Sequence, residues 1–336
     1  MGSRRPSDGI GHTRRGGRRS CRSPSAWLRR CTSGASGEGT VQAFRLGATV
    51  SAMRVFLLGG SGILGTAMRA TLPADATLLA PGHAALDVTD AAAVDLLVSE
   101  RRPDWIINCT AYTAVDAAES HEADAMRLNA DAPASLGAAA RRVGARVLHV
   151  STDYVFGGEG TRPWREDDPV APLSVYGRTK LAGERNLQAS GAEAVIVRTA
   201  WLYGAVGKSF PRTMWERAQQ GLASRVVADQ HGAPTNARDL ATWCWALVAR
   251  EARGVVHASN AGQCTWADVA ERVYAAAGKP GLVTRVSSDE YPVPAPRPRY
   301  SVLDCARLES LIETPRRSWE AALDEFLSDL KQRSAA

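Results

Sequence analysis

The chain has 336 residues, which is enough for one large domain or for two lobes that share a core. Hydrophobic residues make up 45%, as in an ordinary globular protein, and no uninterrupted apolar run is long enough to span a membrane. The net charge of +6 is uneven, because residues 1–52 carry +8 and the remainder therefore carries −2. The remainder lacks the basic composition of a nucleic-acid-binding protein.

Residues 1–52 form a segment of their own, rich in Arg, Gly and Ser and without apolar periodicity. We expect this basic extension to be disordered, and it has no apolar core of the kind that a secretory signal needs. Three interpretations stay open: a start site assigned too far upstream of Met53, an organelle-targeting segment, or a basic tail that binds an anionic partner.

Six cysteines are spread along the chain without any C-x-x-C pair or accompanying histidine cluster. This pattern predicts neither a disulfide framework nor a zinc site. It fits a reducing, cytoplasmic setting.

From Arg54 onward, short apolar runs alternate with longer helical segments, which predicts a parallel sheet covered by helices on both faces. The fold class that we expect is therefore α/β, a Rossmann-like doubly wound parallel sheet with a smaller C-terminal substrate-binding lobe. The predicted strands lie within 54–60, 75–82, 104–111, 145–152 and 194–204. Helices are predicted within 89–103 and 129–144.

The regular alternation weakens after Tyr203. Residues 287–304 are too rich in proline for regular structure, and Ser318 is the expected N-cap of the last helix. Further elements are predicted within 209–221, 239–251, 254–260, 265–278 and 318–332. The predicted domains are an NAD(P)-binding part, 53–200 plus about 236–260, and a sugar-nucleotide-binding lobe, about 201–235 plus 261–333.

The stretch "LLGGSGILG" places Gly59, Gly62 and Gly65 directly after the first predicted strand. Glycines at this spacing allow a tight turn and a close approach of the backbone to a pyrophosphate at the start of the next helix. The strand before the motif and the helical "ILGTAMRATL" after it favour a dinucleotide site.

The second predicted strand ends in "LLAPGHAAL", which contains no acid. An acid at this place binds the adenosine ribose and favours NAD, so its absence leaves room for a 2′-phosphate and predicts NADPH, with NADH as the alternative. Asp87 is the first carboxylate afterwards, although it is also a candidate helix cap. Arg69 and His83 are candidates for the 2′-phosphate.

Tyr176 and Lys180 lie one helical turn apart in "VYGRTKLAGE", and Thr152 ends the strand before that helix. Open α/β sheets bind their ligands at the carboxyl ends of the strands. We expect the lysine ammonium to lower the pKa of the tyrosine, which would then protonate a carbonyl oxygen while a nicotinamide supplies a hydride to the carbon. Packing of two surface residues is the alternative.

The residues from about Arg54 to the end resemble the extended short-chain dehydrogenases/reductases, and within them the dTDP-4-dehydrorhamnose reductases and their relatives that make deoxysugars. The resemblance rests on "GGSGILG", "INCTAYTAVDAAE", "LNADAP", "HVSTDYVFGG", "PLSVYGRTKLAGE", "VRTAWLYG", "ADQHGAPT" and "PAPRPRYSVLD", which follow in the family's order. It implies NADPH-dependent reduction of the C4 ketone of dTDP-4-dehydro-L-rhamnose to dTDP-L-rhamnose.

The resemblance also implies roles for individual residues. Thr152, Tyr176 and Lys180 match the catalytic triad, with Tyr176 as proton donor and Lys180 also holding the nicotinamide ribose. Asp153 and Trp201 match positions that hold the sugar nucleotide, although Trp201 would equally serve as core packing. The matches to cofactor-binding positions are Gly62, Ile63, Leu64, Asp87, Val88, Ala111, Tyr112 and Thr113.

Two further features concern the diphosphate and a metal. Arg297 and Arg299 are candidates to contact the substrate diphosphate, or they are solvated arginines of a proline-rich loop. Some relatives bridge two subunits through magnesium and an acid shortly after the glycine loop, where this chain has Thr66 and Ala67. We therefore expect no magnesium and no magnesium-bridged dimer, while a homodimer of another kind stays open.

Three other functions compete with this one. The catalytic residues act on the same C4 carbonyl in other dTDP-4-keto-6-deoxysugars, as in antibiotic sugar pathways. A relative of this family binds NADP without turnover as the regulatory subunit of a methionine adenosyltransferase, but intact Thr152, Tyr176 and Lys180 argue against that role. Nucleic-acid binding would rest only on the basic extension, so we expect no nucleic-acid partner.

Overall fold

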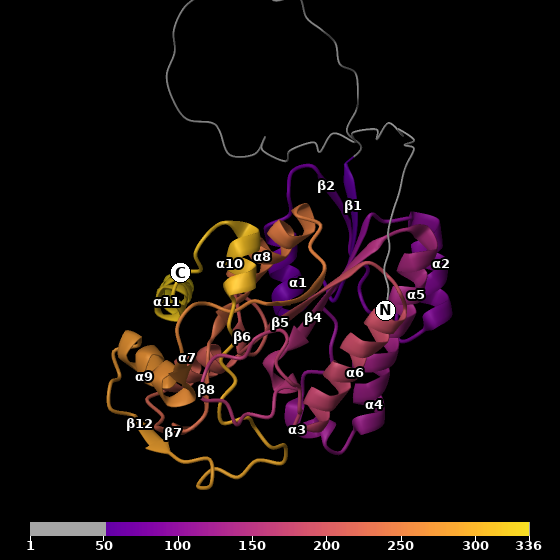
Figure 1. Ribbon diagram of the computed structural model, residues 1–336. Coiled ribbons are helices and arrows are strands. Elements are labelled where there is room, and N and C mark those ends of the chain that lie inside the picture. The colour runs from indigo at the N-terminus through magenta and orange to yellow at the C-terminus, as the bar shows by residue number, and fades with distance from the viewer. Residues whose placement is uncertain (1–51, 336) are drawn as a thin grey trace, which may run out of the picture. The chain divides into compact units, whose positions relative to one another are not determined.

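The computed structural model describes residues 52–335 (Figure 1). The predicted disorder of the basic extension therefore falls outside the described part of the chain, except for Ala52. Within residues 52–335, no helix is both long enough and apolar enough to cross a membrane.

A six-stranded parallel sheet lies at the centre of the described part (Figure 1). The strand order is β10-β5-β4-β3-β1-β2, and every neighbouring pair is parallel. The strands are β1 (Met53–Leu58), β2 (Ala76–Leu79), β3 (Trp105–Asn108), β4 (Arg146–Thr152), β5 (Ala194–Thr199) and β10 (Gly254–His257). The chain leaves β1 in one direction to β2 and returns on the other side to β3, so the carboxyl ends of β1 and β3 flank the crevice where such sheets bind dinucleotides.

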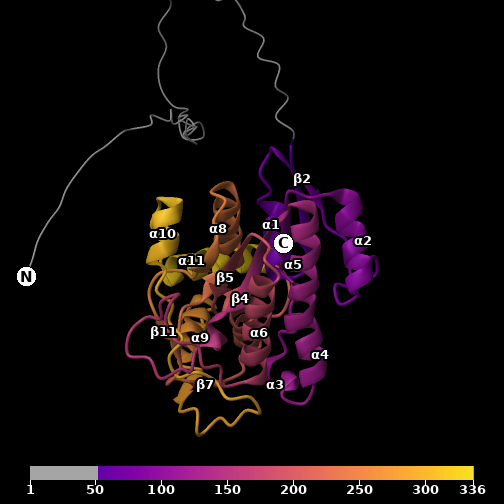
Figure 2. The same cartoon turned by 45° about the vertical axis from the view of Figure 1, so that its right-hand side comes forward.

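Helices cover both faces of the sheet, as the alternating sequence predicts (Figures 1 and 2). Side chains alternate along β1: Phe56 and Leu58 pack with one set of helices, and Val55 and Leu57 with the other. The first set is α2 (Ala91–Arg101), α5 (Ala132–Val143) and α6 (Val175–Ala189). The second set is α1 (Ile63–Ala70), α8 (Ala237–Ala249) and α10 (Ala306–Ile312). The α/β, Rossmann-like prediction is confirmed.

A separate hydrophobic cluster lies outside the sheet and is formed by side chains between Tyr203 and Leu330. Its buried side chains include Tyr203, Trp215, Tyr274 and Phe326. The elements that supply most of it are α7 (Phe210–Gln219), β7 (Ser224–Val227), α9 (Trp266–Ala276), β12 (Val283–Val286) and α11 (Trp319–Ala335). Strand β7 pairs in parallel with β12, away from the main sheet. The domain boundaries given above stay a prediction.

The remaining elements are short. The two-residue strands are β6 (Leu202–Tyr203), β8 (His231–Gly232), β9 (Thr235–Asn236) and β11 (Cys264–Thr265). The helical segments are α3 (Val115–Ala118), α4 (Glu122–Met126), the π-helical turn η1 (Arg127–Asp131) and the 3₁₀ turn η2 (Asp153–Val155).

The predicted helix N-caps accept hydrogen bonds from the first amides of their helices. Asp90 caps α2 by accepting hydrogen bonds from the amides of Ala92 and Ala93, which frees Asp87 from that role. The Ser318 hydroxyl accepts a hydrogen bond from the Ala321 amide at 3.2 Å at the start of α11. Residues 287–304 contain no helix or extended strand, as their prolines predict.

Candidate active site

The glycine loop between β1 and α1 needs glycine for steric reasons. Gly59 has φ +75°, and a Cβ atom there would lie 2.9 Å from the carbonyl carbon of Cys109. A Cβ atom on Gly65 would lie 2.1 Å from the carbonyl oxygen of Gly59, so α1 packs directly against the loop. The loop can therefore bring its backbone amides close to a ligand.

The N-terminus of α1 is suited to an anion. Gly62 is the N-cap and has no side chain that could accept the first amides, and the first turn contains no acid. A cavity of about 590 Å³ opens beside this turn. Among its lining residues are Gly59, Gly60, Ser61, Gly62, Asp87, Val88, Ala111 and Tyr112. These features fit the pyrophosphate and adenosine of a dinucleotide.

Arg69 lies between the glycine loop and the end of β2. A Cβ atom on Gly60 would lie 3.3 Å from the Ala80 Cβ and 3.7 Å from the Arg69 Cδ. Arg69 is exposed and has no ion-pair or hydrogen-bond partner among residues 52–335. His83 lines the cavity of about 590 Å³ described above. The Asp87 carboxylate instead accepts hydrogen bonds from the amide and hydroxyl of Thr89, at 2.9 and 2.8 Å.

A second cavity, of about 550 Å³, holds the predicted catalytic residues. It shares Ser61, Gly62, Cys109, Thr110 and Ala111 with the first cavity, so the two adjoin. Its lining includes Ile63, Leu64, Thr113, Thr152, Asp153, Tyr176, Lys180 and Trp201. Every predicted cofactor or catalytic residue except Gly65 and the 2′-phosphate candidate Arg69 therefore lines one of these two cavities.

Helix α6 carries Tyr176 and Lys180 into this cavity. Ser174 caps the helix by accepting a hydrogen bond from the Gly177 amide at 3.2 Å. A Cβ atom on Gly177 would lie 2.3 Å from the Tyr154 carbonyl oxygen. The small residue thus lets α6 approach the end of β4, where Thr152 lies.

Lys180 is almost fully buried, with 1% of its surface exposed. Its Nζ donates to the Val150 carbonyl at 2.7 Å and lies 3.4 Å from Nε2 of His149. Burial lowers the pKa of Lys180 to about 8, an effect that Glu184 and Cys109 partly oppose.

The structure corrects the expected direction of the Tyr176 pKa. Burial raises the pKa of Tyr176 to about 12, while a hydrogen bond with Thr152 acts in the opposite direction. The predicted lowering by Lys180 is wrong for the protein in this state, because desolvation of the phenolate dominates. Tyr176 is therefore a protonated phenol at neutral pH, as a proton donor must be.

Asp153 lies beside the triad and is 1% exposed. One of its oxygens accepts a hydrogen bond from the Thr152 hydroxyl at 3.0 Å. The other, Oδ2, has no hydrogen-bond donor of good geometry within the described residues, although the Ser301 hydroxyl stabilises the carboxylate. Burial raises the pKa of Asp153 to about 6. A buried carboxylate oxygen with spare capacity suits the hydroxyl group of a sugar.

Trp201 also lines the second cavity, where its indole stacks on Trp266. The Trp201 side chain is only partly buried and lines the same cavity as the predicted catalytic residues, so it is not confined to the core. Trp266 lines the second cavity and a third one.

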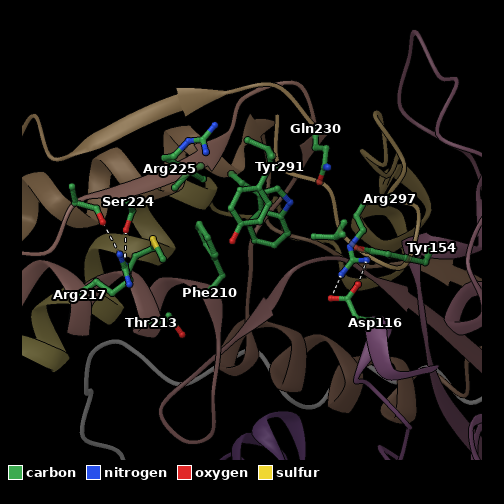
Figure 3. Close-up of a pocket in the computed structure, with 16 residues that line it drawn as sticks. Asp116, Tyr154, Phe210, Thr213, Arg217, Ser224, Arg225, Gln230, Tyr291 and Arg297 are labelled. Atoms are coloured by element: carbon green, nitrogen blue, oxygen red, sulfur yellow. Dashed lines mark hydrogen bonds and ion pairs between the residues drawn. The ribbon is translucent and has the colours of Figure 1, made fainter. Parts of the chain in front are cut away.

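The third cavity has a volume of about 810 Å³ and is drawn in Figure 3. Arg217 and Arg225 lie near one end of it, and neither pairs with a carboxylate of residues 52–335. Arg217 is held by the Ser224 hydroxyl at 2.7 Å and by the Ala223 carbonyl at 2.6 Å. Aromatic side chains in the lining are Tyr154, Phe210, Trp266 and Tyr291.

Sequence reasoning missed most of this third cavity. Arg297 was a candidate to contact the diphosphate, and it does line this cavity. Its guanidinium, however, is paired with the Asp116 carboxylate at 2.6 and 2.9 Å (Figure 3). Arg299 faces Asp289 at 3.9 Å and lies outside this lining. Gln230, within the quoted "ADQHGAPT", was the available signal for the cavity. Between residues 52 and 335, no group of three or more His, Cys, Asp or Glu gathers as metal ligands would.

Comparison with known proteins decides the family. The family model described as the RmlD substrate binding domain matches residues 53–332. This chain belongs to the RmlD family. Among curated RmlD relatives, a dTDP-4-dehydrorhamnose reductase of Streptomyces griseus is 45% identical over 282 residues, covering 81% of this chain and 92% of that protein. A probable dTDP-4,6-dihydroxy-2-methyloxan-3-one 4-ketoreductase of Streptomyces antibioticus is 44% identical over 284 residues, with coverages of 83% and 96%.

A solved structure shares the overall fold described here. The dTDP-4-dehydrorhamnose reductase of Bacillus anthracis, in complex with NADP, superposes with a TM-score of 0.80 at 34% identity. The match covers 82% of this chain and 99% of that one. A dTDP-glucose 4,6-dehydratase of Streptomyces venezuelae has a TM-score of 0.72 at 19% identity and so shares the fold.

Proposed function

We propose that this chain is an NADPH-dependent reductase of the C4 ketone of a dTDP-4-keto-6-deoxysugar, with dTDP-4-dehydro-L-rhamnose as substrate and dTDP-L-rhamnose as product. The observation that carries the proposal is that Thr152, Tyr176 and Lys180 line one cavity with the glycine loop. The names of the similar proteins from Streptomyces griseus and Bacillus anthracis, the latter with NADP bound, support it.

The glycine loop would hold the cofactor pyrophosphate, Asp87 and Val88 would border the adenosine, and Ala111, Tyr112 and Thr113 would lie along the dinucleotide. Bound NADPH supplies a hydride for the C4 carbon. The protein's own part is to position the ketone and to provide the proton.

Tyr176 would donate its phenolic proton to the C4 oxygen, and Thr152 would hydrogen-bond the same oxygen. The raised pKa of Tyr176, about 12, keeps that proton in place before the reaction. Once it has left, the Lys180 ammonium, in the same cavity, would stabilise the tyrosinate. The Asp153 carboxylate would orient a neighbouring sugar hydroxyl, and Trp201 would lie against the apolar face of the deoxysugar.

The third cavity would receive the dTDP part of the substrate. It shares Tyr154 and Trp266 with the catalytic cavity, so one ligand can occupy both. Arg217 and Arg225 have no carboxylate partner within the described part of the chain and would bind the diphosphate, whereas Arg297 is already paired with Asp116. The aromatic rings of Phe210 and Tyr291 are suited to stack on a pyrimidine base.

A second candidate is reduction of another dTDP-4-keto-6-deoxysugar. The specific observation in its favour is the 44% identity to the probable 4-ketoreductase of Streptomyces antibioticus, close to the 45% identity to the reductase of Streptomyces griseus. Both candidates share the same triad chemistry and differ in how the ring substituents meet the cavity beside Trp201.

The test is an assay of the purified chain with NADPH and with NADH against a panel of dTDP-4-keto-6-deoxysugars. We expect turnover with NADPH, and the sugar with the largest kcat/KM decides between the two candidates. Tight NADP binding without turnover of any sugar would contradict the proposal and would favour the regulatory-subunit alternative.

The four described cysteines, Cys109, Cys244, Cys264 and Cys305, are all free thiols. We propose a cytoplasmic location, where thiols stay reduced. Size-exclusion chromatography with light scattering would test the open prediction of a homodimer.

A further inference from the structure

A buried histidine lies directly behind the catalytic lysine and has no role in the mechanism above. His149, on β4, is 1% exposed. Its Nε2 lies 3.4 Å from Nζ of Lys180, and its Nδ1 lies 3.1 Å from Nδ2 of Asn108, at the end of β3. The protonation state and tautomer of this imidazole therefore determine whether Lys180 faces a bare nitrogen or an N–H group.

The orientation of the Asn108 amide is determined by Thr110. Both the backbone amide and the hydroxyl of Thr110 lie within hydrogen-bond distance of Oδ1 of Asn108, at 3.0 and 2.6 Å. The Thr110 amide can only donate, so the Asn108 atom facing it must be the carbonyl oxygen. The atom that faces His149 is consequently the amide nitrogen, which is a donor.

The orientation of Asn108 in turn determines the tautomer of His149. Because Nδ1 accepts a hydrogen bond from Asn108, it carries no proton, and the neutral ring carries its proton on Nε2. Burial lowers the pKa of His149 well below its ordinary value, and Lys180 acts in the same direction, so the ring stays neutral. The imidazole thus presents an N–H group to Lys180.

An N–H group cannot accept a hydrogen bond from an ammonium group, and its positive end disfavours the positive charge. Among residues 52–335, the Val150 carbonyl, at 2.7 Å, is the one group that accepts a hydrogen bond from Lys180. The other groups facing Lys180 are Tyr176 and Glu184 on α6 and the Cys109 thiol after β3. Glu184 is engaged by Arg198 at 2.7 and 2.9 Å and by the Ser151 hydroxyl at 2.5 Å. No acceptor for the remaining Lys180 hydrogens is found within residues 52–335, and Lys180 lines the second cavity, which leaves these hydrogens available to a ligand there.

We propose that His149 is a positioning residue of the active site. As the Nε2–H tautomer, set by Asn108 and Thr110, it directs the hydrogens of Lys180 into the cavity and weakens the hold of this lysine on its proton. The inference rests on the proposed role of Lys180, while the tautomer itself can be observed without turnover.

The tautomer is measured by long-range ¹H–¹⁵N NMR of the full chain with ¹⁵N-labelled histidine. We expect His149 to show a protonated Nε2 and an unprotonated Nδ1, without titration between about pH 6 and 9. The variant His149→Phe identifies the resonance by its loss, and His257→Phe identifies that of the other buried histidine. A protonated Nδ1 with a bare Nε2, or an imidazolium, would overturn the proposal, whether or not the chain reduces any sugar.

The effect on Lys180 is measured as the alkaline limb of kcat/KM with NADPH. Removal of the N–H group in His149→Phe is expected to move the limb upward by roughly half a pH unit or more. His257→Phe removes a buried histidine that hydrogen-bonds the Trp164 carbonyl and does not face Lys180, so it should lower the melting temperature without moving the limb. If His149→Phe does not fold, His149→Leu serves the same purpose, and the wild-type NMR result stands alone. A limb that stays in place in a folded His149 variant would contradict the proposal.

Discussion

Trp201 lies flat on Trp266, with ring centroids 3.6 Å apart and planes 11° from parallel. Trp201 adopts φ +47°, a left-handed conformation that costs a non-glycine residue roughly 1–2 kcal/mol. Gly232 makes room for the indole, because a Cβ atom there would lie 2.4 Å from Trp201 Cε2. The close packing places Trp201 at the wall of the second cavity, against Trp266, which lines both the second and the third cavity.

If Trp266 supports Trp201 as a wall for the sugar, Trp266→Leu should raise KM for the dTDP-keto sugar roughly tenfold, about 1.4 kcal/mol. The Kd for NADPH should stay within about twofold, because Trp266 does not line the first cavity, where the adenosine of the cofactor would bind. Trp243→Leu is the control, since Trp243 packs in the core on the sheet and should affect only stability. Equal effects of both variants on KM would contradict the role of Trp266.

The position of Arg69 makes a prediction about cofactor choice. Its side chain lies beside Gly60 and Ala80. Ala80 directly follows β2, and the 2′-phosphate of NADPH would bind near this strand end, which has no acid. Arg69→Ala should raise the Kd for NADPH by roughly tenfold and leave the Kd for NADH within about twofold, as measured by calorimetry. Arg101→Ala, at an exposed arginine ending α2, should change neither. A parallel loss for both cofactors would assign Arg69 a different role.

Much of the site was predictable because its parts are local in sequence. The glycine loop, Thr152 at the end of β4 and the Tyr176–Lys180 pair each follow from a strand or helix and a short motif. Parallel strands then bring their carboxyl ends to one edge, so Thr152, Tyr176 and the loop had to converge.

The rest depended on contacts between distant segments. The third cavity joins α7, β7 and the proline-rich 287–304 segment, and pairing of Arg297 with Asp116 spans 181 positions. No periodicity in the chain predicts such a meeting. The pKa of Tyr176 was predicted in the wrong direction, because burial in the folded protein outweighs a charge one helical turn away.

The pKa of Lys180, lowered to about 8, predicts the alkaline limit of the reaction. Tyr176 keeps its proton to a much higher pH, so kcat/KM should fall above about pH 8 as Lys180 loses its charge. Glu184 raises the pKa of Lys180, and Glu184→Gln should therefore move this limb to lower pH, opposite to His149→Phe. A limb unaffected by Glu184→Gln would show that Lys180 does not set it.

The Glu184→Gln variant should also be less stable than the wild type. Glu184 and Arg198 form an ion pair whose side chains are 3% and 5% exposed. Removal of the carboxylate leaves a buried guanidinium without its partner, and the free energy of unfolding in urea should fall by roughly 3–5 kcal/mol. Arg54 and Asp104 form an exposed ion pair at 2.9 Å. The control variant Asp104→Asn should change the free energy of unfolding by less than about 1 kcal/mol.

A chain that starts at Met53 should keep the melting temperature and activity of the full chain. The lining residues of all three cavities lie between Leu58 and Arg297, and the composition of residues 1–52 does not supply a core. Differential scanning calorimetry and the ketone-reduction assay on both chains test this. A large loss of either property would show that the extension contributes to the fold.

The central claim is that Tyr176 protonates the C4 oxygen, and the most direct test is kcat of Tyr176→Phe with saturating NADPH and a dTDP-4-keto sugar. Phenylalanine keeps the ring that packs edge-on against Tyr154, with centroids 5.6 Å apart, and removes only the hydroxyl. The melting temperature and the Kd for NADPH should therefore stay close to those of the wild type, while kcat falls by roughly 10² to 10⁴. A folded variant with near-normal kcat would contradict the account, because Tyr176 would then be a packing residue.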